Sequence, residues 1–541
     1  MWLPALQAVH FWGRHLVRNI SLPHGREAEQ WLPALLPLWC VLLFFYGLNA
    51  GDLWRTEGLR AIIGAEFLRS GNWIVPTLYG EPLLTKPPGM YAAIALASWP
   101  VGEVRPWTAR LPSAVAATAT VLLFYGLFRR YVGRRAGLVA ALVLPVSVVW
   151  LDKAGTAEID MVQVFWVAAA IGCLIRAVEA EEAWGRPRGS GDDLPAAFAW
   201  WLGALLCLAG GVLTKWTAPA FFYGMAVPFL WWRGRLRLLW SWRHLTSLAI
   251  AVALCLAWAA AAITNVGWET FYRTVSREAL QRLSWAHYLS IRPHLATNHQ
   301  TSVGPVVGAI IHPAVLLVAN LPWSLWVWTT LRPSFAARWD DRGRFLLAAL
   351  HCWTWPNVLF WSLLPDHTVR HSFPLFPGIV GLAVMVLVRQ PWRLPMRPRE
   401  AVIGLVVVWL LVKVIFVEVV MPRRSAERAP REKGAQLAAA VPPGQTLYLF
   451  RLKDEGIMFY YGRPVRRLPS PQELPPSSEP LFCILGQSEW QEWPTERAAE
   501  VVLPMRDEQG APIVLVRVAP QPAPRGQPQR DRPAPARAGA R

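Results

Sequence analysis

The residues of this chain that could do chemistry are charged side chains at the borders of long apolar segments. Glu57 follows the first apolar block, Lys86 stands before Pro87-Pro88, and Asp160 opens a further apolar block. A charge at membrane depth costs roughly 2.5–3.5 kcal/mol on insertion scales, so such residues are usually functional or paired. A positioned carboxylate can take a proton, and nearby cations can stabilise an anionic leaving group.

Each of these residues also has a purely structural interpretation, which the sequence leaves open. Glu57 fits the first turn of a helix, where the macrodipole favours an acid, and Asp160 could cap a helix, with Glu158 as a competing acid. Lys86 and Lys215 could extend to the membrane interface. Further polar residues fall on the same predicted side of the membrane: Thr56 and Arg60 beside Glu57, then Glu278, Arg282, His367, Arg370 and His371.

Composition places the chain among membrane proteins. It has 541 residues, of which 54% are apolar, and its mean hydropathy is +0.29. The apolar residues form blocks of about 20, which match the thickness of a bilayer core. The formal charge of +19 comes from short basic loops and a basic tail, so we expect no nucleic-acid partner. The six cysteines are scattered and predict neither a disulfide framework nor a zinc site.

The chain is therefore predicted to be an α-helical polytopic membrane protein with a small C-terminal α/β domain. Residues 1–30 form a cytoplasmic amphipathic segment, 31–421 the membrane module, 422–519 an extracytoplasmic domain, and 520–541 a disordered tail. Within the module, 51–89 is a polar loop whose helix starts at Thr56 and ends at Ser70-Gly71, and 265–304 is a long outer loop. Eleven spans are expected: 31–50, 108–128, 134–152, 158–178, 196–213, 216–232, 244–264, 305–331, 344–364, 372–389 and 401–421.

Arginine-rich loops set the predicted orientation. The connections near 129–135, 233–243, 332–344 and 389–399 are dense in Arg and belong in the cytoplasm. An odd number of spans, eleven to thirteen, keeps all four inside and places the candidate residues and the C-terminal domain outside the inner (plasma) membrane. In that domain we expect strands at 446–450, 464–468, 481–485, 500–504 and 512–518, and helices at 455–461 and after Ser470-Pro471.

Several motifs, taken in order, resemble the bacterial lipid A aminoarabinose transferase and protein O-mannosyltransferase-like family of GT-C-fold glycosyltransferases. The resemblance covers roughly residues 30–420. It rests on Thr56-Glu57…Arg60, Ser70-Gly71-Asn72-Trp73, Lys86-Pro87-Pro88, Arg110-Leu111-Pro112-Ser113, Asp160-Met161, Leu213-Thr214-Lys215, Glu278…Arg282, Pro322-Trp323-Ser324 and Arg370-His371…Pro374. The chain departs from the family at two places. The family usually has Asp-Glu where this chain has Thr56-Glu57, and an acid where this chain has Thr85.

The resemblance implies a sugar donor linked to a polyprenyl phosphate and a lipid or protein acceptor, with inversion of the anomeric carbon. Glu57 would take the acceptor's proton, with Asp160 as second choice. Lys86, Arg370 and His371, followed by Lys215 and Arg282, would bind the donor phosphate. No metal or other cofactor is expected, although a divalent metal stays possible, and we expect a monomer. Two alternatives stay open: a transporter or lipid flippase, and a non-catalytic envelope protein of the same fold. The sequence does not identify the sugar or the acceptor.

Overall fold

The computed structural model describes residues 35–184, 193–283, 305–365, 368–389 and 398–521. The predicted segment 1–30 and residues 522–541 of the predicted tail lie outside these ranges, and so does part of the long loop, 284–304. The fold divides into two units, Met1–Glu427 and Arg428–Arg541, and each is described by itself.

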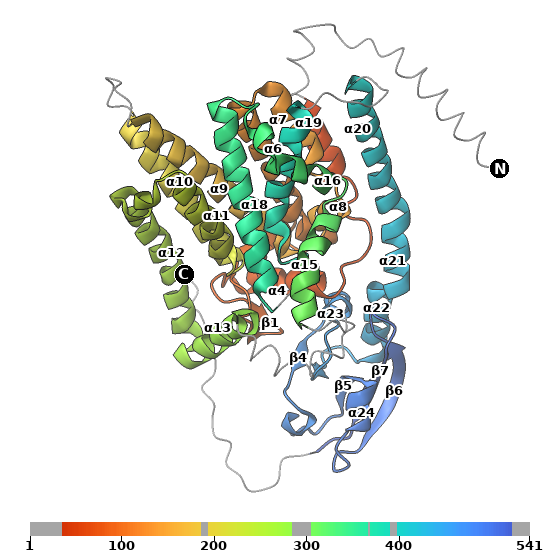
Figure 1. The fold of residues 1–541 in the computed structure, drawn as a ribbon. Coiled ribbons are helices and arrows are strands. Elements are labelled where there is room, and N and C mark those ends of the chain that lie inside the picture. Colours follow the sequence, from red (N-terminus) through yellow and green to blue (C-terminus); the bar gives the residue numbers. More distant parts are fainter. Residues whose placement is uncertain (1–34, 185–192, 284–304, 366–367, 390–397, 522–541) are drawn as a thin grey trace, which may run out of the picture. The chain divides into compact units, whose positions relative to one another are not determined.

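The first unit is a bundle of helices (Figure 1). Its α-helices are α3 (Leu35–Cys40), α4 (Thr56–Ser70), α5 (Gly89–Ser98), α6 (Pro106–Tyr131), α7 (Arg134–Val143), α8 (Val148–Ala154), α9 (Ile159–Trp184), α10 (Asp193–Thr214), α11 (Ala218–Trp232), α12 (Trp242–Val266), α13 (Trp268–Leu283), α15 (Pro305–Ala319), α16 (Ser324–Val327), α17 (Pro333–Ala336), α18 (Asp341–Leu363), α19 (Phe376–Arg389), α20 (Pro398–Ile415) and α21 (Met421–Arg428). Shorter turns are η2 (Val41–Phe45), η3 (Trp99–Val101), η4 (Leu236–Trp240), η5 (Trp328–Leu331), η6 (Phe373–Leu375) and η7 (Phe416–Val420).

Helix α9 lies inside this bundle. It packs against α10, α6 and α11, while α11 packs on α18, α18 on α19, and α19 on α7. Large side chains fill the spaces between them, including the fully buried Trp150, Trp201 and Trp353. Because α9 is covered on several sides, Asp160 in its first turn is almost completely buried.

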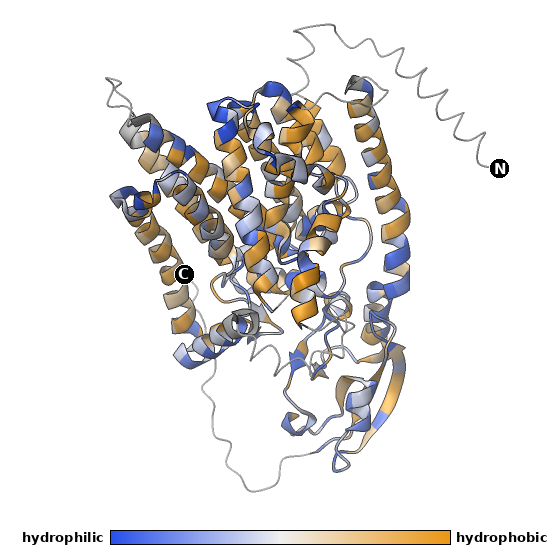
Figure 2. Cartoon of the chain, in the orientation of Figure 1, coloured by the Kyte–Doolittle hydropathy of each residue, from blue (hydrophilic) through white to orange (hydrophobic). Residues whose placement is uncertain are grey.

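The outer helices present apolar faces that only a lipid environment would cover favourably. On α20 the exposed residues include Val407, Val408 and Leu411, and on α12 they include Leu254 and Leu256. Figure 2 shows hydrophobic residues running along the bundle helices. Among the described residues, five helices are long and apolar enough to span a membrane, or seven if each bent pair counts as one span. The chain is an integral membrane protein, and the count of eleven to thirteen spans stays a prediction.

Two predicted spans are broken, which the apolar pattern did not reveal. The span at 134–152 consists of α7 and α8, which meet at 78°, and the span at 305–331 bends by 109° between α15 and α16–η5. Both breaks lie beside a proline, Pro145 in the first and Pro322 in the second, and a proline has no N–H to donate to a helix. The first described helical segment, Leu35–Phe45, is also shorter than the predicted span 31–50.

The polar loop at 51–89 folds as predicted around one helix. Helix α4 runs from Thr56 to Ser70 and ends on Gly71, whose φ of 68° suits a residue without a side chain. A two-stranded hairpin follows, β1 (Thr77–Leu78) with β2 (Glu81–Pro82). Glu66 of α4 accepts hydrogen bonds from the Thr77 hydroxyl and from the backbone N–H of Tyr79, so it holds the hairpin against the helix.

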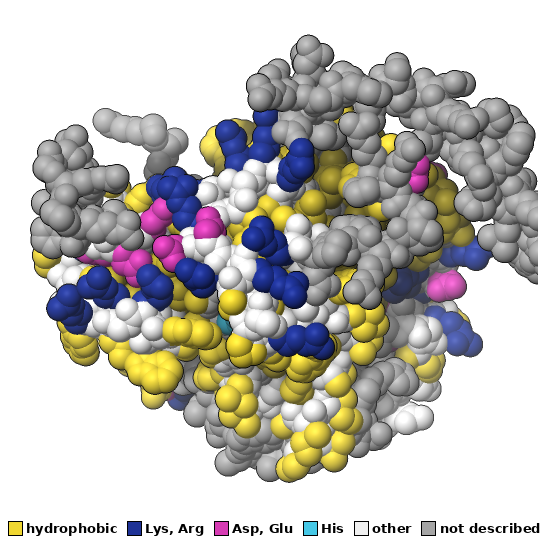
Figure 3. All heavy atoms as spheres, turned by 45° about the horizontal axis from the view of Figure 1, so that its top comes forward, with side chains coloured by type: hydrophobic (Ala, Val, Ile, Leu, Met, Phe, Trp, Pro, Cys, Tyr) yellow, Lys and Arg dark blue, Asp and Glu magenta, His cyan; other side chains and the backbone are white. Residues whose placement is uncertain are grey.

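The two ends of the bundle differ in character. Helices α4 and α13 and the hairpin lie at one end, and the connection between α6 and α7 lies at the other (Figure 1). Figure 3 turns this second end forward and shows Lys and Arg side chains gathered on it.

The second unit contains a five-stranded mixed sheet in the order β4-β3-β5-β7-β6. Strands β3 (Leu447–Leu449), β4 (Val465–Arg467) and β5 (Leu481–Gly486) are parallel, and β7 (Pro512–Val518) and β6 (Ala499–Arg506) are antiparallel additions. Helices α22 (Pro430–Ala440) and α23 (Glu455–Tyr461) pack together. All five predicted strands and the helix at 455–461 are present. The helix expected after Ser470 is the short turn η8 (Pro471–Glu473), and α24 (Gln487–Gln491) was not anticipated.

Candidate active site

The carboxylate of Glu57 is enclosed by donors from α6 and from the connection between α8 and α9. Arg110 of α6 donates from Nε to Oε1 at 3.0 Å and from Nη2 to Oε2 at 3.3 Å. The backbone N–H of Ala157 donates to the same Oε1 at 2.8 Å. Glu57 is 2% exposed and Arg110 is fully buried. Both oxygens of Glu57 therefore accept hydrogen bonds. Removing the charge of either Glu57 or Arg110 would leave the other charge buried without a counter-charge.

Arg110 also ties the chain before α4 to the bundle. Its Nη1 donates to the carbonyl oxygens of Leu48, Ala50 and Gly51, at 3.0, 2.7 and 3.2 Å, and its Nη2 donates to that of Asp52 at 3.2 Å. A guanidinium can satisfy several carbonyls at once because its five N–H groups form a fixed fork. The Glu57–Arg110 pair thus fixes where α4 begins.

Glu158 lies directly before α9, and its carboxylate contacts two polar side chains of α4, those of Thr56 and Arg60. The Thr56 hydroxyl donates to its Oε1 at 2.6 Å, and Arg60 Nη1 lies 2.8 Å from its Oε2. Thr56 is the first residue of α4, as predicted, and its hydroxyl bonds to Glu158 rather than to the backbone at the start of its own helix. Thr56, which stands where the family that this chain resembles usually has Asp, thus donates a hydrogen bond to Glu158.

Asp160 occupies the first turn of α9, two residues after Glu158. Lys215, just after α10, donates to its Oδ1 at 2.8 Å, and both side chains are almost completely buried. The other oxygen, Oδ2, receives no hydrogen bond from the described residues and faces Nε of Arg370 at 3.5 Å. His371 lies within electrostatic range of the same carboxylate. Asp160 therefore keeps one acceptor oxygen that is paired only by charge.

Arg370 contacts both Glu158 and Asp160 and is itself partly exposed. It comes from the segment between α18 and η6, and its Nη1 lies 3.9 Å from Oε2 of Glu158. The Arg370 side chain is 43% exposed, whereas those of Glu158 and Asp160 are 8% and 1% exposed. An anion that approached from the open side would meet this guanidinium first.

Lys86 forms a second ion pair in the same neighbourhood. Its Nζ lies 2.8 Å from Oε2 of Glu278 in α13, and both side chains are less than one-fifth exposed. The buried Tyr91 of α5 is within electrostatic range of Arg60, Glu158 and Glu278, so the Lys86 pair and the Glu158 cluster are neighbours.

Most of the predicted residues converge. Glu57 shares α4 with Thr56 and Arg60, which contact Glu158, while Asp160, Lys215, Arg370 and His371 form the adjoining group; Lys86 pairs with Glu278. Arg282 lies in the last turn of α13, and its side chain is outside the described residues. His367 lies in the segment 366–367, which is also outside them.

Sequence reasoning underrated two residues. Glu158 was only a competitor of Asp160, although the spacing of the two acids at the start of a span signals a pair. Arg110 entered only as part of a motif, although a charge in a predicted span is itself a signal for a buried partner.

No group of three or more His, Cys, Asp or Glu side chains that could hold a metal ion occurs among the described residues. The two buried acids are instead faced by cations. The expectation that no metal is needed stays a prediction.

Comparison with known proteins places this geometry in a known class of fold. Residues 85–191 match the family model described as dolichyl-phosphate-mannose-protein mannosyltransferase. Over 90% of its length the chain superposes on 98% of the crystal structure of ArnT from Cupriavidus metallidurans bound to undecaprenyl phosphate, with a TM-score of 0.70 and 17% identity. The fold is therefore the GT-C membrane fold of that structure.

The curated relatives point in the same direction. The chain is 26% identical over 372 residues to undecaprenyl phosphate-alpha-4-amino-4-deoxy-L-arabinose arabinosyl transferase 2 of Pseudomonas fluorescens (strain Pf0-1), a match covering 64% of this chain and 59% of that protein. It is 30% identical over 241 residues to an enzyme of the same activity from Pseudomonas savastanoi pv. phaseolicola, covering 44% and 41%. The chain thus spans less than two thirds of the length of the curated relatives it matches.

Proposed function

We propose that this protein is a membrane glycosyltransferase that moves a sugar from a polyprenyl-phosphate donor to a hydroxyl of an envelope lipid or protein, with inversion of the anomeric carbon. The observation that carries the proposal is the pair of buried acids, Glu158 and Asp160, faced by the half-exposed Arg370. The relatives named for undecaprenyl phosphate and dolichyl phosphate support the donor class. The site would lie on the extracytoplasmic side of the inner membrane, as the basic loops predict.

Cations are the chemistry that this donor requires. When the sugar leaves, its phosphodiester with one negative charge becomes a monoester with nearly two. Cations beside the phosphate therefore bind the transition state more strongly than the ground state, which is what accelerates a reaction. Arg370 is the best placed of the described cations because it is the most exposed member of the Glu158–Asp160 cluster. Lys86 and His371 would assist, and Lys215 would mainly hold Asp160.

We assign proton acceptance to Asp160 rather than Glu57. An acceptor hydroxyl needs a carboxylate oxygen that can receive its hydrogen bond. Within the described part of the chain, both oxygens of Glu57 already accept hydrogen bonds, from Arg110 and Ala157, whereas Oδ2 of Asp160 accepts none. Glu57 would then position α4, and Glu158 would orient Arg370 beside Asp160.

The proposal is tested with the purified protein in vesicles supplied with a labelled undecaprenyl-phosphate sugar. The label should move to a lipid or protein fraction of the envelope. Lys86→Ala and Arg370→Ala should each lower the turnover number by roughly a hundredfold, since each removes charge that stabilises the departing phosphate. Arg277→Ala is the matched control, because Arg277 is an exposed cation beside Glu278 in α13.

Two results would contradict the proposal. One is that the wild-type protein transfers label to no fraction although it is folded. The other is that Lys86→Ala and Arg370→Ala transfer label as fast as Arg277→Ala.

A further inference from the structure

A pocket lies far from the candidate active site, at the other end of α6 and α9. It has a volume of about 640 Å³ and is lined by α6, α9, Trp200 of α10 and Arg342 of α18. Arg110 of the candidate site and Arg130 of this pocket are both on α6, 20 residues apart. At 1.5 Å per residue they are separated by about 30 Å, which is the thickness of a bilayer core. The pocket therefore opens at the opposite membrane interface.

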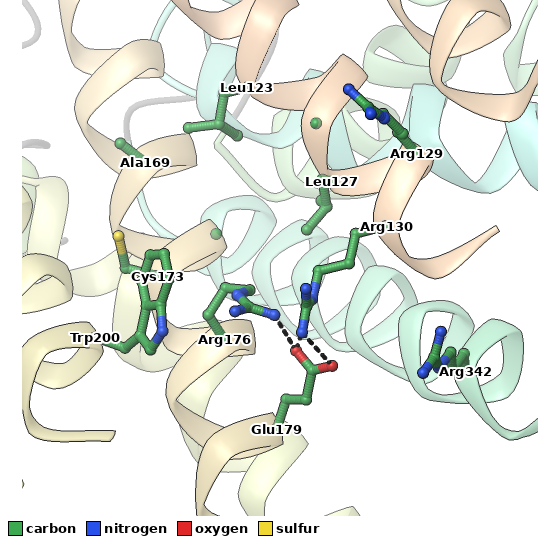
Figure 4. A pocket seen from close by; sticks show the side chains of 12 residues that line it. Leu123, Leu127, Arg129, Arg130, Ala169, Cys173, Arg176, Glu179, Trp200 and Arg342 are labelled. Atoms are coloured by element: carbon green, nitrogen blue, oxygen red, sulfur yellow. Dashed lines mark hydrogen bonds and ion pairs between the residues drawn. The ribbon is translucent and has the colours of Figure 1, made fainter. Parts of the chain in front are cut away.

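The lining of this pocket is divided into a basic part and an apolar part (Figure 4). Four arginines, Arg129, Arg130, Arg176 and Arg342, and one acid, Glu179, give it a formal net charge of +3. Leu123 and Ala169 lie on the side away from Glu179, and they precede the charged residues of their helices by one to three turns. Since both helices reach the interface at their charged ends, the apolar part lies deeper in the membrane.

Both carboxylate oxygens of Glu179, the acid that lines the pocket, already accept hydrogen bonds from neighbouring side chains. Glu179 accepts from Arg130 at 3.0 and 2.9 Å, from Arg176, and from the Tyr131 hydroxyl at 2.7 Å. Arg176 also stacks over the ring of Trp200, at 4.8 Å from its centroid. These contacts fix the floor of the pocket but neutralise only part of its charge.

The charges of two arginines are not compensated by a carboxylate among the described residues. Within the part of the chain that the structure describes, no carboxylate lies within ion-pair distance of Arg129 or Arg342. Both side chains are exposed at the mouth of the pocket, on α6 and α18. Guanidinium groups suit phosphate oxygens because they can donate two parallel hydrogen bonds.

We propose that this pocket binds an anionic phospholipid of the leaflet opposite the candidate active site. The head group would be attracted by the exposed guanidinium groups of Arg129 and Arg342, and an acyl chain would run along Leu123 and Ala169. A basic mouth at the interface above an apolar groove fits a molecule that carries both features, and basic pockets between membrane helices commonly bind such head groups. The inference does not depend on the proposed transferase activity.

The test is native mass spectrometry of the purified, delipidated full chain in detergent, titrated with phosphatidylglycerol or phosphatidylcholine of equal chain length. The wild type should retain phosphatidylglycerol at least several-fold more strongly than phosphatidylcholine. The double variant Arg129→Ala/Arg342→Ala should bind phosphatidylglycerol roughly tenfold more weakly. The control Arg235→Ala/Arg237→Ala removes the same charge from another basic connection that does not line the pocket, and it should bind like the wild type.

A competition arm separates a lipid from free phosphate. Inorganic phosphate at the lipid's concentration should not displace phosphatidylglycerol. Displacement by inorganic phosphate, equal retention of the two lipids, or equal losses in the two double variants would each overturn the proposal. Melting temperatures of all variants without lipid show whether a loss of binding is instead a loss of fold.

Discussion

At the scale of single residues, Glu57 and Asp160 differ in what surrounds their carboxylate oxygens. Glu57 is bound on both oxygens by groups of the protein, and Asp160 on only one. Burial alone does not separate them, since both are almost fully enclosed. On this difference we propose that Glu57 holds the fold and that Asp160 takes part in the chemistry.

Glu57→Gln should therefore act mainly on stability. The substitution leaves the guanidinium of Arg110 buried without its counter-charge, and breaking a buried pair costs about 3–5 kcal/mol. We expect a clearly lower melting temperature in detergent, and a transfer rate per folded molecule within a few-fold of the wild type. Asp152→Asn is the control, because Asp152 is a more exposed acid, paired with Lys153.

The opposite outcome would assign Glu57 to the reaction itself. If Glu57→Gln melts like the wild type and yet loses transfer by a hundredfold or more, Glu57 takes the proton and our assignment is wrong.

The members of this site are easier to predict from the sequence than their pairing. Polar residues at the ends of apolar blocks are enough to point to Asp160, Lys215 and Arg370. Which cation faces which acid depends on contacts between residues 50 or more positions apart, such as Glu57 with Arg110. Helical periodicity contains no information about such partners.

At the scale of elements, the start of α5 is packed too tightly to accept a side chain. A Cβ on Gly89 would lie 2.7 Å from the carbonyl oxygen of Leu213 and 2.8 Å from Oγ1 of Thr214, at the end of α10. These residues adjoin Lys215, and Gly89 follows Lys86-Pro87-Pro88. The contact therefore sets the distance between two cations of the candidate site.

Gly89→Ala should push α5 away from α10. We expect a destabilisation of about 1–3 kcal/mol, as for other overpacked positions, together with slower sugar transfer. Thermal unfolding in detergent and the transfer assay measure the two effects. Gly404→Ala in α20 is the control, since no atom lies within 4 Å of the added Cβ. Equal melting temperatures and rates for the two variants would show that α5 and α10 are not coupled through Gly89.

The end of a helix could be predicted from a glycine with a left-handed backbone conformation, but not from a proline, which occurs both at breaks and inside helices. Gly71 marked the end of α4 because only glycine readily takes its φ. Proline is ambiguous: Pro145 and Pro322 accompany breaks, whereas Pro112 and Pro356 lie inside α6 and α18. Whether a proline breaks a helix depends on how its neighbours satisfy the freed carbonyl groups.

At the scale of the whole molecule, the two units respond to different conditions. The membrane unit contains the buried ion pairs Glu57–Arg110 and Asp160–Lys215, and the second unit carries a buried acid of its own. Asp454 precedes α23 and is 4% exposed, and its Oδ2 has no hydrogen-bond partner among the residues that the structure describes. Burial, together with the charges of Glu508 and Asp507, raises the pKa of Asp454 to about 7.

The second unit should therefore lose stability as pH rises. In the unfolded chain Asp454 loses its proton near its ordinary pKa of 3.8, while the folded unit keeps it until about 7. The contribution of Asp454 to the free energy of unfolding therefore decreases as the pH rises from about 3.8 to about 7, by on the order of 4 kcal/mol in total. Hydrogen exchange of β3 and β5 in the full chain, corrected for intrinsic rates, should show weaker protection at pH 8 than at pH 5.5. Asp454→Asn should flatten that difference, and an unchanged slope would contradict the assignment.

The proposed role of Asp160 as proton acceptor is decided by the single-turnover rate of sugar transfer by Asp160→Asn, compared with wild type in the same vesicles. Asparagine keeps the size of the side chain but cannot take the acceptor's proton. We predict a loss of about 10²–10⁴-fold in the rate per folded molecule, as expected for the removal of a general base. A folded Asp160→Asn variant that transfers the sugar at the wild-type rate would contradict the account.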